Sequence, residues 1–255
     1  MIVFGSGNRG ATFWGGAEPH ADPVPWGTLT ELRSAGYITV ERAWQDQTGG
    51  WFIGAEGAGL TGASCRFATL LHAIAEQTPA DEPLCALGSS AGSVELSYAL
   101  AAYGLDERVQ FAMFSGGPIA RVDHACTGEW DCVSATTSHP ATACSTVRCD
   151  VGELVAALDL LHAGACRAND SERLRTDSLA SLTADRLALQ TETSFQWGDG
   201  DCLGIAQSGR AAADLFGSNG VAVTQRVIAD AGHSVQRSPA GGANIVQEMQ
   251  RGCVP

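Results

Sequence analysis

Gly88-Ser89-Ser90-Ala91-Gly92 joins an apolar run over 83–87 to a run with helical periodicity over 93–103. This pattern is typical of a sharp strand-to-helix turn that exposes the hydroxyl of its central serine to a base and to amide donors. Such a turn needs glycine two residues either side of Ser90, because its backbone is strained and neighbouring chain passes too close for a Cβ atom. The alternative is an ordinary loop in which Ser90 only caps the following helix. We interpret the segment as a nucleophile elbow.

A serine nucleophile needs a histidine to accept its proton and a carboxylate to orient that histidine. Of the six histidines, only His233 lies in a loop directly after the last predicted strand. Two carboxylates, Asp199 and Asp201, follow the preceding predicted strand in the glycine-rich loop 198–201. Because Asp201 stands at the apex of this loop, we predict it as the orienting acid. Asp199 is the second candidate and Asp230 a distant third.

The order serine, aspartate, histidine, each in a loop after a strand, resembles that of the α/β-hydrolase superfamily. The resemblance covers nearly the whole chain and is carried by Gly88-Ser89-Ser90-Ala91-Gly92, Gly198-Asp199-Gly200-Asp201 and Ala231-Gly232-His233. It implies an α/β fold with a mostly parallel sheet of about six strands, flanked by helices. It also implies a serine hydrolase in which Ser90, His233 and Asp201 are the catalytic residues.

In that superfamily two backbone amides form the oxyanion hole. The resemblance implies that one belongs to Ala91, the residue after the nucleophile. The second would come from the loop Gly5-Ser6-Gly7-Asn8, where we favour the amide of Ser6 or Gly7. Because this loop follows the first predicted strand, the two antiparallel strands that usually precede it in the family are expected to be missing. The His-Gly pair of lipase oxyanion loops is also absent.

Strand-like and helix-like segments alternate in the first and last parts of the chain, which is typical of parallel βα units. Predicted strands cover 1–4, 37–44, 83–87, 109–114, 191–197 and 221–228, and predicted helices of the sheet layers cover about 25–35, 61–77, 93–103, 203–216 and 242–250. The alternation stops over 117–190, where helices are predicted only over 151–162 and 171–189. We expect one domain over 1–255 with a disulfide-stapled insertion or cap over 117–190.

Composition excludes several kinds of chemistry. The chain contains no lysine, since all fifteen of its Lys and Arg residues are arginine. Schiff-base catalysis, pyridoxal phosphate attachment, Walker-type phosphate binding and Ser-Lys dyads are therefore impossible. The formal net charge of −13 opposes binding to nucleic acid, and no apolar stretch approaches the length of a membrane span. We expect no nucleic-acid partner, no membrane insertion, no cofactor and a monomer.

The nine cysteines indicate disulfides rather than a zinc site, because none forms a Cys-x2-Cys pair. Disulfides imply secretion into an oxidising compartment. We therefore expect that Met1 stands in place of a removed export signal. Since nine is odd, at least one thiol is free unless it pairs between chains. We predict that Cys85, in the buried strand before the elbow, is that free thiol.

The substrate is indicated only by aromatic residues near the expected site. Phe13, Trp14, Trp51 and Trp197 fall in or beside loops at the ends of predicted strands, and Ser89 adjoins the nucleophile. We predict that these five residues contact substrate, although packing inside the protein is the alternative for most of the tryptophans. An acidic, disulfide-stapled hydrolase with an aromatic cleft would suit bulky or polymeric esters, resembling cutinases and other polyester hydrolases. A peptidase, a thioesterase, an acyltransferase or a non-catalytic binding protein of the same fold remain alternatives.

Overall fold

A computed structural model describes residues 1–7, 10, 13–15, 22–44, 50–52, 54–127, 152–201 and 205–254. Its strands form one parallel six-stranded sheet in the order β2-β1-β3-β4-β5-β6. The strands are β1 (Ile2–Gly5), β2 (Thr39–Arg42), β3 (Cys85–Ser89), β4 (Phe111–Ser115), β5 (Glu192–Gly198) and β6 (Val223–Ile228). The predicted fold class is therefore confirmed, and each predicted strand lies within one or two residues of its observed bounds.

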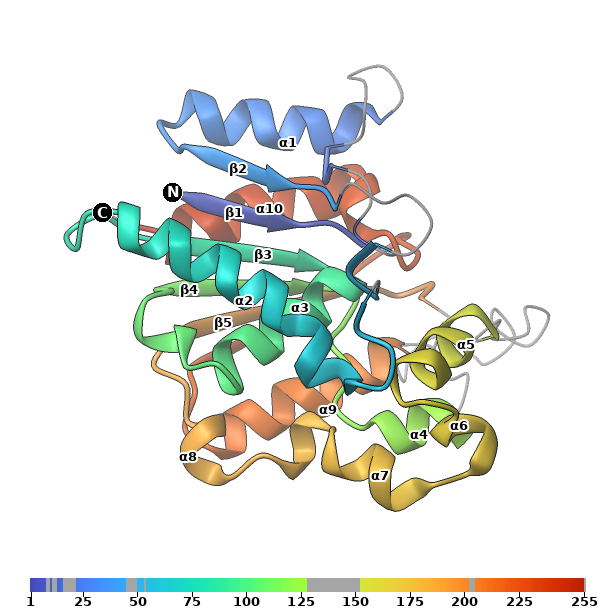
Figure 1. The fold of residues 1–255 in the computed structure, drawn as a ribbon. Helices are drawn as coiled ribbons and strands as arrows, with labels where there is room; N and C mark the ends of the chain where they lie inside the picture. The colour runs from blue at the N-terminus through green and yellow to red at the C-terminus, as the bar shows by residue number, and fades with distance from the viewer. Residues whose placement is uncertain are drawn as a thin grey trace.

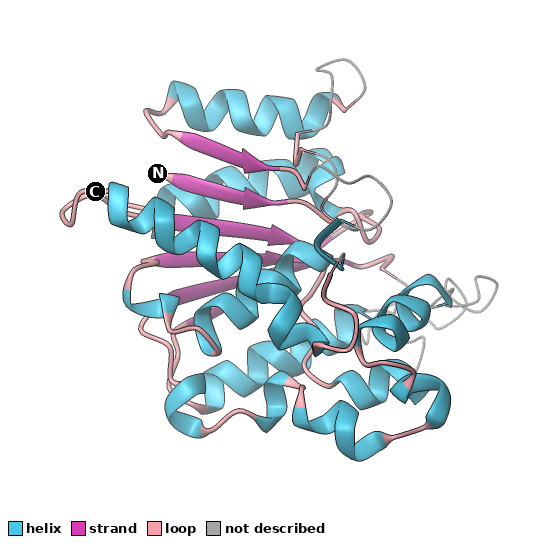
Figure 2. Cartoon of the chain, viewed as in Figure 1, coloured by secondary structure: helices cyan, strands magenta, loops and turns pink. Residues whose placement is uncertain are grey.

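Helices cover both faces of this sheet (Figures 1 and 2). They are α1 (Pro23–Ser34), α2 (Gly59–Gln77), α3 (Ala91–Ala101), α9 (Ile205–Ser218) and α10 (Pro239–Gly252), with 3-10 turns η1 (Gly50–Phe52), η2 (Leu105–Glu107), η3 (Leu179–Ser181) and η4 (Val235–Arg237). Alternate strand residues enter opposite layers, as the twofold side-chain period of a strand requires. Ile2 and Phe4 pack with Leu29 of α1 and Ile245 of α10, whereas Val3 joins the core on the α2 and α3 face.

Two disulfides connect described residues, Cys85–Cys253 and Cys126–Cys166. The prediction that Cys85 is the free thiol is wrong. The end of α10 lies beside the start of β3, so the Cα atoms of Cys85 and Cys253 are 5.9 Å apart despite a sequence separation of 168. Among the described cysteines, Cys65 is free and exposed. The remaining four, Cys132, Cys144, Cys149 and Cys202, lie outside the described residues.

Several short helices lie between β4 and β5 in place of the sheet-layer alternation. They are α4 (Val122–Thr127), α5 (Gly152–Leu161), α6 (Ala165–Ala168), α7 (Ser171–Thr176) and α8 (Ala184–Leu187). The Cys126–Cys166 disulfide joins α4 to α6. The predicted continuous helix over 171–189 is wrong, because Ser178, Leu182 and Thr183 have extended backbones that separate α7, η3 and α8.

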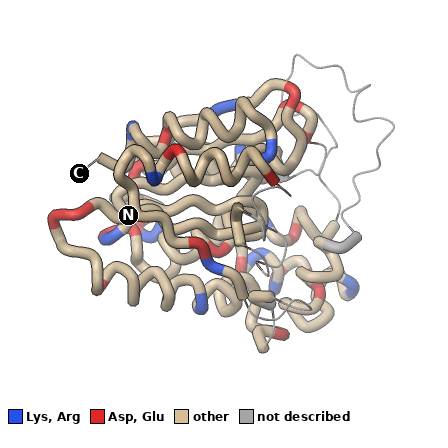
Figure 3. Tube along the Cα trace, turned by 90° about the horizontal axis from the view of Figure 1, so that it is seen from above, with Lys and Arg blue, Asp and Glu red and all other residues tan. Residues whose placement is uncertain are grey.

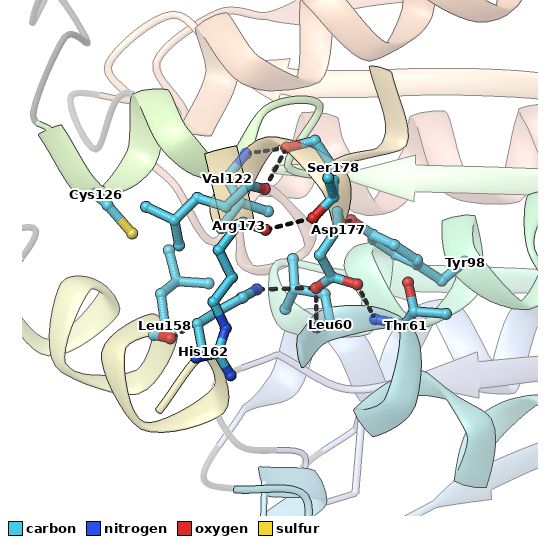
Figure 4. A network of polar contacts seen from close by, with 12 residues as sticks. Leu60, Thr61, Tyr98, Val122, Cys126, Leu158, His162, Arg173, Asp177 and Ser178 are labelled. Atoms are coloured by element: carbon cyan, nitrogen blue, oxygen red, sulfur yellow. Dashed lines mark hydrogen bonds and ion pairs between the residues drawn. The ribbon is translucent and has the colours of Figure 1, made fainter. Parts of the chain in front are cut away.

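Asp177, just after α7, ties this segment to the sheet layers (Figure 4). Its carboxylate accepts hydrogen bonds from the amides of Leu60 and Thr61, which belong to the first turn of α2 and have no acceptor within the helix. The Nε2 of His162 lies 2.9 Å from the same carboxylate, and Tyr98 of α3 donates to the Asp177 carbonyl. One side chain thus links α2 to the helices between β4 and β5.

Charge is distributed rather than gathered on one element. Figure 3 shows acidic residues on several helices and loops of the described chain, intermixed with arginine. No helix among the described residues is long and apolar enough to cross a membrane.

Candidate active site

The turn between β3 and α3 has the strained backbone that the glycine pattern indicates. Ser90 adopts a φ of 52°, a region that side-chain-bearing residues rarely occupy. A Cβ atom on Gly88 would lie 2.3 Å from the carbonyl oxygen of Gly92, and one on Gly92 would lie 2.3 Å from the carbonyl oxygen of Gly5. The Ser90 amide donates to the Ser115 carbonyl at the end of β4, 2.8 Å away. Both glycines are therefore required by close packing, and Ser90 projects from the carboxyl end of the sheet.

Three predicted residues meet at this edge. The Nε2 of His233 lies 2.8 Å from the Oγ of Ser90, and its Nδ1 lies 3.0 Å from the Oδ2 of Asp201. The Asp201 side chain is fully buried, whereas that of His233 is 19% exposed. An imidazole whose Nδ1 faces a carboxylate carries its proton on that nitrogen, so Nε2 is left to accept from the Ser90 hydroxyl. The arrangement can transfer a proton from Ser90 to His233.

The loops after β5 and β6 pack against each other to hold the imidazole and the carboxylate in place. Gly200 donates its amide to the Ala231 carbonyl at 3.0 Å, and a Cβ on Gly198 would lie 2.0 Å from the same oxygen. Gly116, after β4, lies close behind the imidazole, since a Cβ there would approach His233 Cε1 to 3.2 Å. The glycines of these loops thus permit backbone approaches that bring Asp201 to His233.

Asp199 and Asp230 are the alternative candidates for the acid that orients His233. Asp199 is half-buried, and its amide donates to the Ile228 carbonyl at the end of β6. Asp230 is exposed on a turn with a φ of 56°. Of the three carboxylates, that of Asp201 makes the hydrogen bond to the His233 ring.

The predicted oxyanion donors border the same serine. Ala91 is the first residue of α3, and the amide of a first helical residue has no acceptor within its own helix. A Cβ on Gly7 would lie 3.0 Å from the Ser90 Cβ, so the backbone after β1 lies directly against the elbow. Ser6 is buried, with its carbonyl oxygen close to Gly92. Backbone of two segments, the start of α3 and the loop after β1, therefore lies beside Ser90.

The five predicted substrate contacts differ in exposure. Phe13 is 51% exposed, whereas Trp51 and Trp197 are 1% exposed and belong to the hydrophobic core. Trp14 is also buried and donates from its Nε1 to the Oγ of buried Ser89, 2.8 Å away. We therefore assign Trp51 and Trp197 to packing, correcting the expectation that they line a cleft. This hydrogen bond satisfies the Trp14 indole N–H and connects the loop after β1 to the elbow.

Two charged residues that lie near the site, Arg42 and Glu95, were not identified from the sequence. Arg42 at the end of β2 and Glu95 on α3 form an ion pair whose side chains are 4% and 0% exposed. The signal was a lone carboxylate in the otherwise uncharged run 91–101, since a buried charge requires a partner. The partner lies far away in the sequence and only the fold identifies it. Among the described residues, no three His, Cys, Asp or Glu side chains gather as metal ligands would.

No protein-family model and no curated protein sequence matches the chain. Among solved structures, a carboxyl esterase from the fungus Tuber melanosporum is similar over 99% of this chain and 78% of its own, with a TM-score of 0.60 and 13% identity. An alpha/beta hydrolase from a Mar Chica lagoon sediment metagenome is similar over 98% and 90%, with a TM-score of 0.53 and 14% identity. An acylaminoacyl peptidase from Pyrococcus horikoshii has a TM-score of 0.67 and 11% identity over 98% of this chain and 37% of its own. The chain therefore has the α/β-hydrolase fold.

Proposed function

We propose that this protein is a serine hydrolase that cleaves carboxylic esters through an acyl-enzyme intermediate. The observation that supports this most directly is the continuous hydrogen-bonded contact from Ser90 to His233 to Asp201, with the Asp201 carboxylate buried and the serine on a strained turn. A helix cap does not need a histidine at its hydroxyl or a buried carboxylate behind that histidine. The contacts suit proton transfer from the serine better than capping.

In the proposed reaction, the Ser90 Oγ attacks the ester carbonyl carbon while its proton passes to the His233 Nε2. The carbonyl oxygen becomes an oxyanion that the Ala91 amide and an amide of Ser6 or Gly7 stabilise. Collapse of this intermediate breaks the bond to the alcohol, which leaves with the proton from His233. Water then attacks the acyl-Ser90 ester with His233 again as base, and the acid is released.

Bulky or polymeric esters are the substrates that we propose within this class. Phe13 supports this choice, because its exposed ring lies one residue before Trp14, whose indole contacts the elbow. An exposed aromatic ring on a segment that contacts the elbow can pack against a large apolar acyl or aromatic group. Replacing Phe13 with Ala should lower hydrolysis of a polyester film more than that of p-nitrophenyl acetate. An equal effect on both substrates would contradict the preference.

We further propose that the protein is secreted and acts as a monomer. The Cys85–Cys253 and Cys126–Cys166 disulfides support an oxidising location. Counting free thiols in native and reduced protein checks this proposal, and nine free thiols in native protein would contradict it. Size-exclusion chromatography with light scattering should give the mass of one chain, 26.4 kDa.

Hydrolysis of short- and long-chain p-nitrophenyl esters, together with labelling by a fluorophosphonate probe, tests the central assignment. Wild type should react in both assays, and Ser90→Ala should react in neither. Ser97→Ala is a matched control, because Ser97 lies on the helix that follows Ser90 and its buried hydroxyl donates to a backbone carbonyl rather than to a histidine. A wild type that neither hydrolyses esters nor labels would contradict the enzyme and favour a binding protein of the same fold. Labelling with cleavage of amides or thioesters instead would indicate a peptidase or a thioesterase.

A further inference from the structure

The ion pair of Arg42 and Glu95 lies in an enclosed space between β2 and α3. The Arg42 guanidinium pairs with one carboxylate oxygen of Glu95, and Trp44 donates from its Nε1 to the other at 3.2 Å. The guanidinium also lies over the rings of Trp44 and Phe67, at 5.1 and 5.2 Å from their centroids. Both charges are thus paired and shielded from solvent. Glu95 stands on the same helix as the elbow, little more than one turn after Ser90.

Stability alone explains this pair poorly. Removing two charges from water costs several kcal/mol per ion, and well-packed apolar residues of similar volume are often as stabilising. Burial lowers the pKa of Arg42 to about 9, which still leaves the guanidinium charged at neutral pH. A charged group retained in such a place commonly makes a directional contact that an apolar side chain could not make.

That contact is with the loop after β1. Arg42 donates from Nη1 to the carbonyl of Gly10 at 3.2 Å, and the Trp44 amide donates to the same oxygen at 2.8 Å. The amide of Gly10 in turn donates to the carbonyl of Gly7 at 3.0 Å. Farther along, the Gly15 amide donates to the side chain of Glu41 at 2.8 Å. The end of β2 therefore holds the loop after β1 at two points.

The held loop is the one that touches the nucleophile. Gly7 lies against Ser90 so closely that a Cβ on it would be 3.0 Å from the serine Cβ. The Gly10 amide is hydrogen-bonded to the Gly7 carbonyl. We therefore expect a shift of Gly10 to move the amides of Gly7 and Ser6 relative to Ser90. Displacement of a catalytic group by about 1 Å can lower the reaction rate about 10²-fold.

We propose that Arg42 and Glu95 are positioning residues that hold the loop after β1, and with it the second oxyanion donor, against Ser90. This inference rests on the proposed hydrolase function. Glu95 fixes the guanidinium and Arg42 fixes the Gly10 carbonyl, while neither touches the substrate. Since oxyanion contacts strengthen in the transition state, loss of the pair acts on kcat rather than on KM.

The double variant Arg42→Met/Glu95→Gln tests the proposal without leaving one charge buried alone. Its kcat for p-nitrophenyl butyrate should fall about 10²-fold while KM stays within about threefold. Amide hydrogen exchange in the peptide that contains Gly7 and Gly10 should become faster. Arg108→Met is the matched control, because Arg108 also donates to a backbone carbonyl but precedes β4, at the opposite end of the strands. Its kcat should stay within about twofold of wild type.

If the double variant does not fold, Arg42→Lys provides a second test, because this substitution keeps the positive charge. A lysine ammonium can pair with Glu95 but lacks the planar fork that reaches both partners, so kcat should fall about tenfold. An active wild type whose two variants retain kcat, or lose only substrate affinity, would overturn the positioning role alone. A wild type without esterase activity or phosphonate labelling would overturn the proposed function itself.

Discussion

The Nε2 of His233 lies 2.8 Å from the Oγ of Ser90, although 143 residues separate them in the chain. Ser90 follows β3 and His233 follows β6, and two other strands lie between these in the sheet. The loop after β6 therefore reaches back across the carboxyl edge of β4 and β5 to meet the elbow. Gly116 and Gly198 make room for it, because side chains there would meet the backbone around His233. This contact is the basis of the proposed function and of several predictions.

The assignment of Asp201 as the acid that orients His233 predicts that substitutions at Asp201 and Asp199 have very different effects on kcat. Asp201→Asn should lower kcat by about 10³- to 10⁴-fold, because an amide cannot hold the histidine tautomer that accepts the serine proton. Asp199→Asn should cost less than about tenfold, since the Asp201 bond to His233 remains. Steady-state ester kinetics of both variants compares them directly. The reverse ranking would show that Asp199 is the orienting acid.

The elbow glycines should tolerate no side chain. Gly88→Ala and Gly92→Ala each place a Cβ about 2.3 Å from a carbonyl oxygen, so each should lower the free energy of unfolding by about 3 kcal/mol or more. Urea denaturation measures this loss. Gly27→Ala is the control, because nothing lies within 4 Å of its Cβ position in α1 and alanine favours a helix. Equal stability of all three variants would mean that the elbow is not tightly packed.

The Cys85–Cys253 disulfide should contribute substantially to stability, because it links β3 to the end of α10 over a sequence separation of 168. Replacing both cysteines with alanine should lower the free energy of unfolding by about 2–5 kcal/mol. Cys65→Ser, at the exposed free thiol, should change it by less than about 0.5 kcal/mol. Denaturation of the two proteins under non-reducing conditions measures the difference. Equal values would mean that the bond is not formed in solution.

Asp177 should protect the start of α2 from hydrogen exchange. Asp177→Asn keeps one acceptor oxygen but removes the negative charge beside His162 and the amides of Leu60 and Thr61. The expected loss of stability is about 1–3 kcal/mol, with faster exchange of those two amides. Asp170→Asn is the control, since asparagine can also accept from the Arg173 amide at that exposed cap. Unchanged exchange in Asp177→Asn would exclude the proposed link to α2.

Local pattern predicted most of the sheet and the loops of the site. The strands were recognisable because buried parallel strands are short apolar runs. The elbow was recognisable because only glycine fits at two of its positions, where the backbone packs too closely for a side chain. The positions of Ser90, Asp201 and His233 in loops after strands indicated that they would meet, and the structure brings them into hydrogen-bond contact. These features depend on neighbours in the sequence or on the common edge of a parallel sheet.

Features that depend on distant partners could not be predicted in this way. The region 171–189 has helical periodicity, but Asp177 binds the start of α2 and the backbone after it becomes extended. The sequence around Cys85 predicts a free thiol in a buried strand, but the fold of α10 places Cys253 beside it and the two form a disulfide. In each case a tertiary contact overrides a local preference.

The most direct test of the central claim is the mass of the protein after brief reaction with p-nitrophenyl acetate at acidic pH, followed by peptide mapping. We predict one added acetyl group, located on Ser90 and absent from Ser90→Ala. The Asp201→Asn variant should acquire it far more slowly. An acetyl group on any other residue, or ester hydrolysis that persists in Ser90→Ala, would contradict the account.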